Sequence, residues 1–489
     1  MKISNALKKK INKCVVRIIA EDIGINWNIP YLIEEPAKGQ GTGFFINSEG
    51  HILTCAHVVN GAKKLYIEIP HFGSEKYECS VVSICPDFDV AIIKCDKYKS
   101  KEYLKLGNSD KLQVGMEVQV VGFPVSLKSS TNNSNNLKFT IGIIKGQQNG
   151  KIETDSAINP GNSGGPLFCN NEVIGINSMK MVGEALESIG YAVPINNYKI
   201  VKDDMIKKNQ IIVNRPNLLI NYNNTDKAFI KQITNVKIDN GIMVTQILKG
   251  SPFEKTAIKE GSIIYQINDI KIDNYGLTSN YKWIGTNINI NILLDNFKNN
   301  EEINIKYSNH ALDLDSARVK ESNKYKKLSE CKIKLEPFIS QSRTMYPVFE
   351  DIPYIILGGM IFMNFCSNHL LNADNANLNI LCAARSMEEL IKPRVILTFI
   401  FPNTTVNILN NLKKDNFINK INDITVTSIK ELQHALKKPL IINKKEYIKF
   451  EADNEKFVIM TIDEIVKQDL LFSDIYKYPL NEFHTLHEK

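Results

Sequence analysis

The stretch Asn159-Pro160-Gly161-Asn162-Ser163-Gly164-Gly165-Pro166-Leu167 decides how the fold of this chain is interpreted. Glycines tolerate positive φ values and close backbone approach, so Ser163 can sit exposed on a tight bend. The backbone amides of Gly161, Asn162 and Ser163 then form a candidate oxyanion hole, where negative charge on a reacting carbonyl would be stabilised. A short run of this kind also fits a glycine-rich turn in an all-β domain, so the serine needs partners before it indicates catalysis.

Two upstream segments supply the partners that a nucleophilic serine needs. A serine hydroxyl is a weak nucleophile until a neighbouring base takes its proton, and a third group must orient that base. His57 follows an apolar strand and a turn of small residues, and Asp89 precedes the apolar run 90–94, with Asp87 as the competing acid. The order His, Asp, Ser is that of the chymotrypsin barrels and differs from the order in subtilisin. We therefore predict a Ser-His-Asp site that includes Ser163.

Five motifs together resemble the HtrA/Deg family of serine proteases. They are Gly41-Thr42-Gly43-Phe44-Phe45-Ile46, Thr54-Cys55-Ala56-His57-Val58-Val59, Asp89-Val90-Ala91-Ile92-Ile93-Lys94, the run from Thr154 to Leu167, and Ile189-Gly190-Tyr191-Ala192-Val193-Pro194. The resemblance implies that His57 is the general base, Asp89 its orienting acid and Ser163 the nucleophile. Asp89 is preferred to Asp87 because the family's acid directly precedes a hydrophobic-Ala-hydrophobic stretch. The resemblance implies no metal and no cofactor.

The resemblance also implies the fold class, which is mainly β. Residues 14–200 are expected to form a chymotrypsin-like protease domain of two six-stranded β-barrels, with the catalytic residues in the cleft. Residues 1–13 are basic and are expected to be a solvated arm rather than a short helix or a membrane-surface segment. A polar loop at 126–136 occupies the place of a loop that helps set the active or inactive state in this family.

Two PDZ-like α+β domains are expected after the barrels. Residues 215–310 contain strand, turn and short-helix signals in the order of a PDZ domain, with Ser251 and Pro252 at the start of the helix. Residues 311–345 are interpreted as a linker or return segment. Residues 346–465 form a second, degenerate PDZ-like domain, because 416–424 echo 261–268, and residues 466–489 are a C-terminal tail. The segment around 351–362 resembles the plant-type Deg branch.

The specificity pocket can be predicted in part. Trypsin-type enzymes have an acid six positions before the nucleophile, where this chain has Ala157, so cleavage after Arg or Lys is not expected. The uncharged floor favours small or medium aliphatic residues of the substrate. Ile189 and the loop 179–188 are expected to form the walls. Asn177 and Ser178 are expected to contact the substrate backbone.

Composition excludes several other classes of function. The 489 residues carry a net charge of +7, and the lysines are scattered, which does not suit nucleic-acid binding. The 9 cysteines contain no C-x-x-C pair, so we predict neither a zinc site nor a disulfide framework, and Cys55 is interpreted as a small buried residue. No stable membrane span and no secretory signal are predicted, which makes an intracellular compartment the expectation.

The function predicted from these observations is that of an HtrA/Deg-type serine endopeptidase. The resemblance implies unfolded or damaged proteins as substrates and a homo-oligomer built from trimers. The alternative is a latent or inactive protease that acts as an oligomeric holdase or PDZ scaffold. A third possibility, an adaptor that only recognises C-termini, is disfavoured because the carboxylate loop near 218–221 lacks the usual glycine.

Overall fold

The computed structural model divides the chain into two compact units. Unit 1 comprises residues 1–22 and 37–338, and unit 2 comprises residues 23–36 and 339–489. The residues that the structure describes are 4–125, 136–181, 189–207, 210–234, 238–278, 287–309, 312–313, 318–319, 328–372, 382–383 and 385–487.

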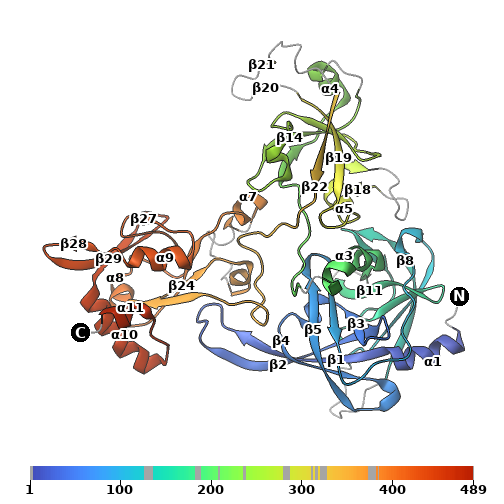
Figure 1. Ribbon diagram of the computed structural model, residues 1–489, viewed down its shortest axis with the longest axis horizontal. Helices are drawn as coiled ribbons and strands as arrows, with labels where there is room; N and C mark the ends of the chain where they lie inside the picture. Colours follow the sequence, from blue (N-terminus) through green and yellow to red (C-terminus); the bar gives the residue numbers. More distant parts are fainter. Residues whose placement is uncertain are drawn as a thin grey trace. The chain divides into compact units, whose positions relative to one another are not determined.

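The first β-barrel of unit 1 closes in the strand order β1-β2-β3-β6-β5-β4 (Figure 1). Its strands are β1 (Val15–Ile25), β2 (Ile33–Phe45), β3 (His51–Thr54), β4 (Ala62–Glu68), β5 (Lys76–Cys85) and β6 (Val90–Lys94). Strand β3 pairs with both β2 and β6, and its four residues are buried. This central position explains the continuous apolar run that precedes His57.

The second barrel closes in the order β10-β11-β12-β9-β8-β7, so the prediction of two six-stranded barrels is confirmed. Its strands are β7 (Glu117–Gly122), β8 (Lys138–Gln148), β9 (Lys151–Thr154), β10 (Pro166–Cys169), β11 (Glu172–Met181) and β12 (Ile189–Pro194). Helix α3 (Ile195–Lys207) follows, and Tyr198, Val201 and Met205 on one of its faces are buried. These residues share one hydrophobic cluster with residues of both barrels, such as Phe44 and Val121, which fixes the barrels against each other.

The basic N-terminus is a helix and not the solvated arm that we expected. Helix α1 (Asn5–Cys14) begins at Ser4, whose hydroxyl accepts a hydrogen bond from the Leu7 amide. Ile11 and Cys14 are fully buried in the same cluster as the barrel residues. Apolar residues at positions 7, 11 and 14 recur at helical spacing, and their burial outweighs the surrounding lysines.

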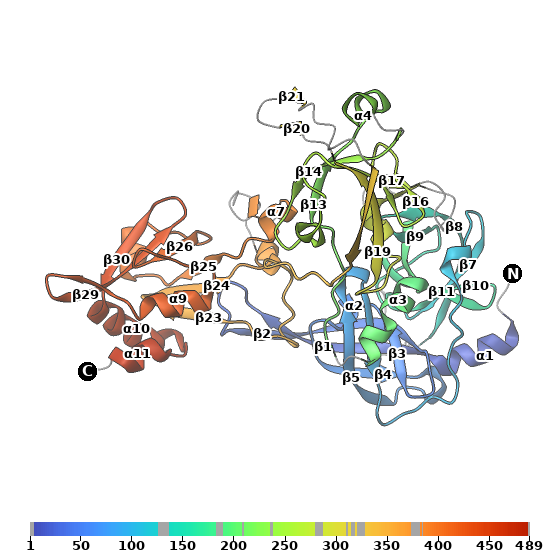
Figure 2. The ribbon, with the colours of Figure 1, turned by 45° about the horizontal axis from the view of Figure 1, so that its top comes forward.

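The middle part of unit 1 is a sheet in the order β13-β14-β15-β19-β22, with β16 paired to β15 (Figure 2). Its main elements are β13 (Ile220–Asn223), α4 (Lys227–Thr234), β14 (Ile242–Ile247), the 3₁₀ turn η4 (Pro252–Lys255), β15 (Ile263–Ile267), β16 (Ile270–Lys271), α5 (Ile290–Leu294), β19 (Glu302–Ser308) and β22 (Leu328–Lys334). Strand β22 pairs with β19 along its whole length. The expected boundary at residue 310 is therefore too early, because the return segment completes this sheet.

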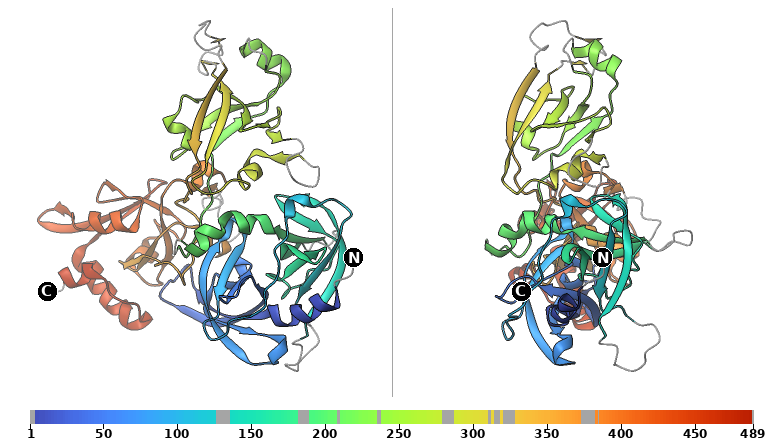
Figure 3. Two further views of the ribbon diagram at one scale, coloured as in Figure 1. Left: turned by 45° about the vertical axis from the view of Figure 1, so that its right-hand side comes forward. Right: turned by 90° about the vertical axis from the view of Figure 1, so that its right-hand side faces the viewer.

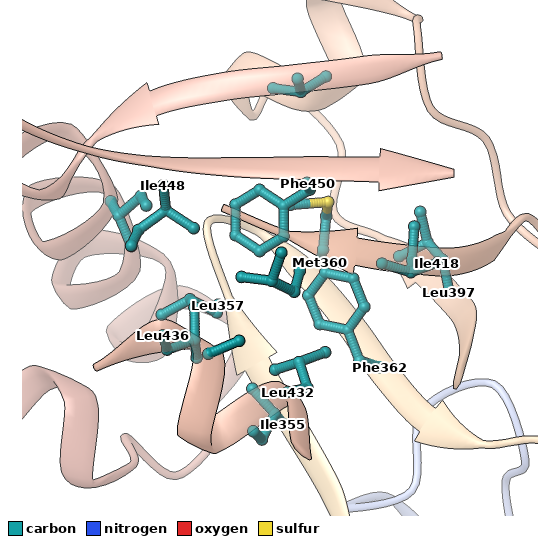
Figure 4. Packing of buried hydrophobic residues seen from close by; sticks show 14 of the residues in the cluster. Ile355, Leu357, Met360, Phe362, Leu397, Ile418, Leu432, Leu436, Ile448 and Phe450 are labelled. Carbon is teal, nitrogen blue, oxygen red and sulfur yellow. The ribbon is translucent and has the colours of Figure 1, made fainter. Parts of the chain in front are cut away.

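Unit 2 is built on a sheet in the order β23-β24-β25-β26-β29-β28, with β27 paired to β26 and β30 to β29. The C-terminal strands and helices of this unit are drawn in orange and red in Figure 3. The strands are β23 (Tyr354–Leu357), β24 (Met360–Asn364), β25 (Val395–Ile400), β26 (Phe417–Ile421), β27 (Ile424–Thr425), β28 (Leu440–Ile442), β29 (Lys445–Ala452) and β30 (Phe457–Thr461). Among the described residues its α-helices are α7 (Met387–Leu390), α8 (Thr405–Leu409), α9 (Ile429–Leu436), α10 (Ile462–Tyr476) and α11 (Glu482–His487). Figure 4 shows how Leu432 and Leu436 of α9 face Ile355, Leu357 and Phe362 in the core.

The expected C-terminal tail is part of this core. Helix α10 crosses the expected boundary at residue 465, and Val466 and Phe483 belong to the same buried cluster as the sheet. The Thr461 hydroxyl and Glu464 carboxylate form a capping box that fixes where α10 begins. Because α10 and α11 bury apolar side chains against the sheet, the domain ends beyond the boundary that the sequence indicated.

Unit 2 also includes the end of the β1–β2 hairpin, residues 23–36. Trp27 packs in a cluster with Cys366 and Phe417, and only 7% of it is exposed. The Asn28 carbonyl accepts a hydrogen bond of 2.9 Å from Thr398 Oγ1 on β25. Tyr31 donates a hydrogen bond to the carbonyl of Tyr476. This segment of the first barrel is thus part of the core of unit 2.

Candidate active site

His57 and Asp89 are brought together by the ends of two paired strands. His57 lies in the short helix α2 (Ala56–Val59) after β3, and Asp89 directly precedes β6. The Nδ1 atom of His57 lies 2.9 Å from each carboxylate oxygen of Asp89. The His57 amide also donates to Asp89 Oδ1 at 3.0 Å. The side chain of His57 is 43% exposed and that of Asp89 16%, so the ring keeps access to solvent while the acid is shielded.

Asp89, and not Asp87, faces the histidine because of the turn between β5 and β6. Residues Pro86–Phe88 form a 3₁₀ turn that ends at Asp89 in the left-handed region, with φ of 55°. The Asp87 carboxylate accepts a hydrogen bond of 2.8 Å from the amide of Arg215. Burial alone would raise the pKa of Asp89, but the hydrogen bonds and charge of His57 and the hydrogen bond of Ser178 bring the pKa below its ordinary value. Asp89 is therefore held as a carboxylate.

Ser178 links the acid to the candidate nucleophile, a role that the sequence analysis missed. Its hydroxyl donates to Asp89 Oδ2 at 2.7 Å, and its carbonyl accepts a 2.5 Å hydrogen bond from the Ser163 hydroxyl. The β11–β12 register shifts between Asn177 and Met179, so Ser178 is an extra residue in its strand. A bulge of this kind turns a side chain away from the regular alternation. The Ser178 side chain is fully buried beside Asp89, and the expected contact of its backbone with the substrate backbone stays a prediction.

The bend that carries Ser163 requires glycine at two positions. Gly161 has φ of 95° and Gly164 has φ of 85°, values that side chains rarely adopt. A Cβ atom at Gly164 would lie 2.1 Å from both the Thr42 carbonyl and the Thr54 hydroxyl. Thr42 also braces the bend, because its hydroxyl donates to the Gly161 carbonyl at 2.6 Å and its amide to the Ser163 carbonyl at 2.8 Å.

Of the three candidate oxyanion-hole amides, that of Asn162 already donates a hydrogen bond within the protein. Its amide donates to the Asn159 carbonyl at 2.9 Å and closes a turn, so it cannot point at a substrate as the sequence analysis expected. Within the part of the chain that the structure describes, the amides of Gly161 and Ser163 donate no hydrogen bond. These two amides remain as candidate donors on either side of the bend.

The predicted substrate contacts are placed differently from one another. The Asn177 side chain is fully buried, and its amide group donates to the carbonyls of Val121 and Pro166, so this side chain supports the barrel, and the expected contact of residue 177 with the substrate backbone stays a prediction. Ala157 and Ile189 are both partly exposed. Residues 182–188 of the predicted pocket wall 179–188 lie outside the described residues. Residues 126–135 of the predicted regulatory loop 126–136 also lie outside them.

Cys55 lies close to the acid and the histidine. One ligand atom each of Cys55, His57 and Asp89 lies within 4.8 Å of the others, and no further cluster of this kind occurs among the described residues. Burial raises the pKa of the Cys55 thiol well above its ordinary value, and the thiol donates to the Asn177 carbonyl at 3.2 Å. A protonated thiol is a poor metal ligand because metals bind the thiolate. These observations suit a small buried residue.

Comparison with known protein families matches two separate parts of the chain. Residues 41–176 match the family described as trypsin-like peptidase domain, and residues 347–471 match the PDZ domain family. Over 252 residues the chain is 31% identical to a probable periplasmic serine endoprotease, DegP-like, of Chlamydia trachomatis, which covers 49% of this chain and 48% of that protein. It is 32% identical over 265 residues to the putative serine protease HhoA of Synechocystis, covering 49% of this chain and 63% of the relative.

Among solved structures, the HtrA-type protease AlgW with a decapeptide superposes with a TM-score of 0.48 at 19% identity, covering 69% of this chain and 99% of AlgW. No helix among the described residues is both long and apolar enough to cross a membrane. The chain spans about half the length of the curated relatives that it matches first. Taken with the paired barrels and the placement of His57, Asp89 and Ser163, these matches show that the chain contains a trypsin-like peptidase domain and a PDZ domain, and that it is similar to DegP-like serine endoproteases over about half of its length.

Proposed function

We propose that this chain is a serine endopeptidase in which Ser163 attacks a peptide carbonyl of a protein substrate. The observation that carries the proposal is the linked arrangement of His57, Asp89, Ser178 and Ser163. Asp89 holds Nδ1 of the imidazole, which leaves Nε2 as the atom that accepts the proton from the serine and later returns it to the leaving amine. The acyl group then remains on Ser163 until water removes it.

Electrostatic support for the tetrahedral intermediate would come from two backbone donors. The amides of Gly161 and Ser163 carry no hydrogen bond within the described residues, so they are available to an oxyanion. Loss of one such donor lowers kcat by roughly 10²- to 10³-fold in serine proteases. Thr42 holds both ends of this bend through the carbonyls of Gly161 and Ser163, and β2 thereby becomes part of the scaffold of the site.

A latent form of the same enzyme is the second candidate. The Ser163 hydroxyl donates to the Ser178 carbonyl, whereas catalysis requires that hydrogen to be directed at His57 Nε2. Activation of this form requires the Ser163 hydroxyl to turn from the Ser178 carbonyl toward His57. The alternative function, an oligomeric holdase or PDZ scaffold with little proteolysis, corresponds to a chain that remains in the observed state.

We further propose small or medium aliphatic residues at the cleavage site and unfolded or damaged proteins as substrates. The support for the pocket is that Ala157 and Ile189 are uncharged and partly exposed. The substrate class is supported by the relationship to DegP-like endoproteases. A homo-oligomer built from trimers follows from the same relationship.

Two PDZ-like domains are also part of the proposal. The sheet of the middle region, in the order β13-β14-β15-β19-β22, matches β24-β25-β26-β29-β30 of unit 2 strand for strand. In both, a short helical segment follows the second of these strands and a two-residue strand pairs with the third. The segment 351–362 resembles that of the plant-type Deg branch, to which we assign the chain.

Casein degradation by the wild type beside Ser163→Ala tests the function. We expect the wild type to cut and the variant to lose ~10³-fold or more of kcat. Light scattering of both proteins gives the oligomer, and mapping of the cut sites tests the aliphatic pocket. If neither protein cuts but both suppress aggregation, the scaffold function replaces the protease. If both cut equally, Ser163 is not the nucleophile.

A further inference from the structure

The PDZ domain of unit 2 has one strand more at its edge than the related sheet in unit 1. Strand β13 is the edge of its sheet, whereas its counterpart β24 is covered by β23. Strand β23 runs antiparallel to β24, and Tyr354 to Leu357 pair with Met363 to Met360. PDZ domains recognise an extended peptide by adding it as a strand to a sheet edge. The chain itself therefore supplies a strand where such a peptide would add.

The side chains of β23 also fill the space between β24 and helix α9. Ile355 is 3% exposed and Leu357 is fully buried, and both pack in one cluster with Leu432 and Leu436 of α9 (Figure 4). Alternate side chains of a bound peptide give a PDZ complex its specificity by entering pockets of this kind. Here the pockets hold residues of the same chain.

A carboxylate lies at the end of β23 as well. After Leu357 the chain turns at Gly358 and Gly359, whose φ values are 59° and 72°. The Gly358 amide donates to Asp469 Oδ2 at 2.8 Å, and the Gly359 amide donates to Asp469 Oδ1 at 3.0 Å. Successive amides that converge in this way form an anion-binding concavity. A PDZ domain holds the C-terminal carboxylate of its ligand in backbone amides of this type.

Asp469 is well fixed in this position. It lies on α10 and is fully buried. Its carboxylate also accepts a hydrogen bond from Tyr478 at 3.2 Å, and His484 Nε2 lies 2.9 Å from Oδ2. A buried carboxylate is tolerated only when it is hydrogen-bonded in this way. In the middle region the amide of Leu219, just before β13, is bound by the side chain of Asn217 and not by a carboxylate.

We propose that the amides of Gly358 and Gly359 are a carboxylate-binding site that the chain's own Asp469 fills, with β23 in the place of the guest strand. The PDZ domain at residues 347–471 is thus bound to an internal ligand. C-terminal peptides do not enter it while Asp469 is in place. The proposal does not depend on proteolysis and can be tested in a chain that carries Ser163→Ala, which prevents cleavage of the probes.

The first test is chemical rescue of Asp469→Ala in this background, with sodium acetate as the probe. Removal of the carboxylate leaves the amides of Gly358 and Gly359 and Nε2 of His484 without their acceptor, whereas the Tyr478 hydroxyl keeps the backbone carbonyl of residue 469. Acetate should then bind and raise the midpoint of thermal unfolding by at least about 2 °C more than in the parent. Acetamide and chloride at equal concentration should have no such effect. Asp474→Ala, an exposed position on the same helix, is the matched control.

Asp469→Asn is the second variant. It keeps the volume of the side chain, so we expect it to fold even if Asp469→Ala does not. It loses one charge, and faster amide hydrogen exchange is expected at the Gly358–Gly359 turn than in the parent. The proposal is overturned if acetate raises the unfolding midpoint of the Asp474→Ala variant as much as that of Asp469→Ala. It is also overturned if acetate does not stabilise Asp469→Ala and hydrogen exchange at the Gly358–Gly359 turn is unchanged in Asp469→Asn.

The second test uses a labelled peptide that ends in a free carboxylate after an aliphatic residue, beside the same peptide with an amidated end. In the parent, neither peptide should change hydrogen exchange over residues 354–364. The proposal is wrong if the free-carboxylate peptide alone protects this segment in the parent, because the amides would then be open to guests.

Discussion

Substitution of Ser178 by alanine tests the reasoning about the active site most sharply. The change removes the hydroxyl that donates to Asp89 Oδ2 at 2.7 Å and keeps the carbonyl that accepts from Ser163. A hydrogen bond to a charged group contributes about 1.5–3 kcal/mol, and 1.4 kcal/mol corresponds to a factor of ten. If all of this hydrogen-bond free energy stabilises the transition state, its loss lowers kcat/KM by roughly 10- to 100-fold.

The direction of the pH effect follows from the same contact. The Ser178 hydroxyl is one of the groups that lower the pKa of Asp89. Its removal raises that pKa, so the carboxylate is protonated at a higher pH and the acid limb of the activity profile moves upward. The variant should therefore lose more activity at pH 5 than at pH 8. If the hydroxyl only stabilised the local structure, the variant would lose the same fraction of activity at every pH.

The assay is kcat/KM on casein as a function of pH, with thermal unfolding measured in parallel. Ser83→Ala is the matched control, because Ser83 is a fully buried serine of the first barrel. Its hydroxyl has no partner among the described residues, so its loss should leave activity within about twofold. The reasoning is refuted if Ser178→Ala retains wild-type kcat/KM at pH 5, or if Ser83→Ala loses as much.

Three further outcomes are expected. Gly164→Ala should fail to fold the nucleophile bend, because its Cβ would lie 2.1 Å from a backbone carbonyl, and circular dichroism with an active-site acylating probe would show the loss. Burial raises the pKa of Asp295 to about 7, so its contribution to stability is present below pH 4 and is lost as the pH rises to about 7. Asp295→Asn should therefore stabilise the protein more at pH 8 than at pH 5, by at most about 3 kcal/mol in urea unfolding, and equal effects at both pH values would contradict this. Trp27→Ala should cost about 3 kcal/mol or more of unit 2 stability, seen as faster hydrogen exchange over 360–366, and unchanged exchange would show that the segment 23–36 is not part of that core.

The tertiary structure corrected the sequence analysis mainly where side chains meet across long separations. The tail beyond residue 465 has ordinary helical composition, and nothing local in it indicates that Asp469 binds an amide 110 residues earlier in the sequence. The segment that forms helix α1 was expected to be a solvated arm because of its many lysines. The burial of Ile11 that stabilises this helix depends on a barrel formed by later residues. Local propensity does not contain this information.

The sequence by itself determined the apolar strands, the order of His57, Asp89 and Ser163, and the glycines of the bend, while the two barrels were expected from the family resemblance. These features depend on short-range chemistry, since strands need apolar runs and a bend with positive φ needs glycine. Only the tertiary structure decided that Asp87 turns to Arg215, that a bulge directs Ser178 to Asp89, and that Asn177 is buried. Each of these depends on the register between strands, which a single strand's sequence does not fix because a shift of one residue exchanges its two faces.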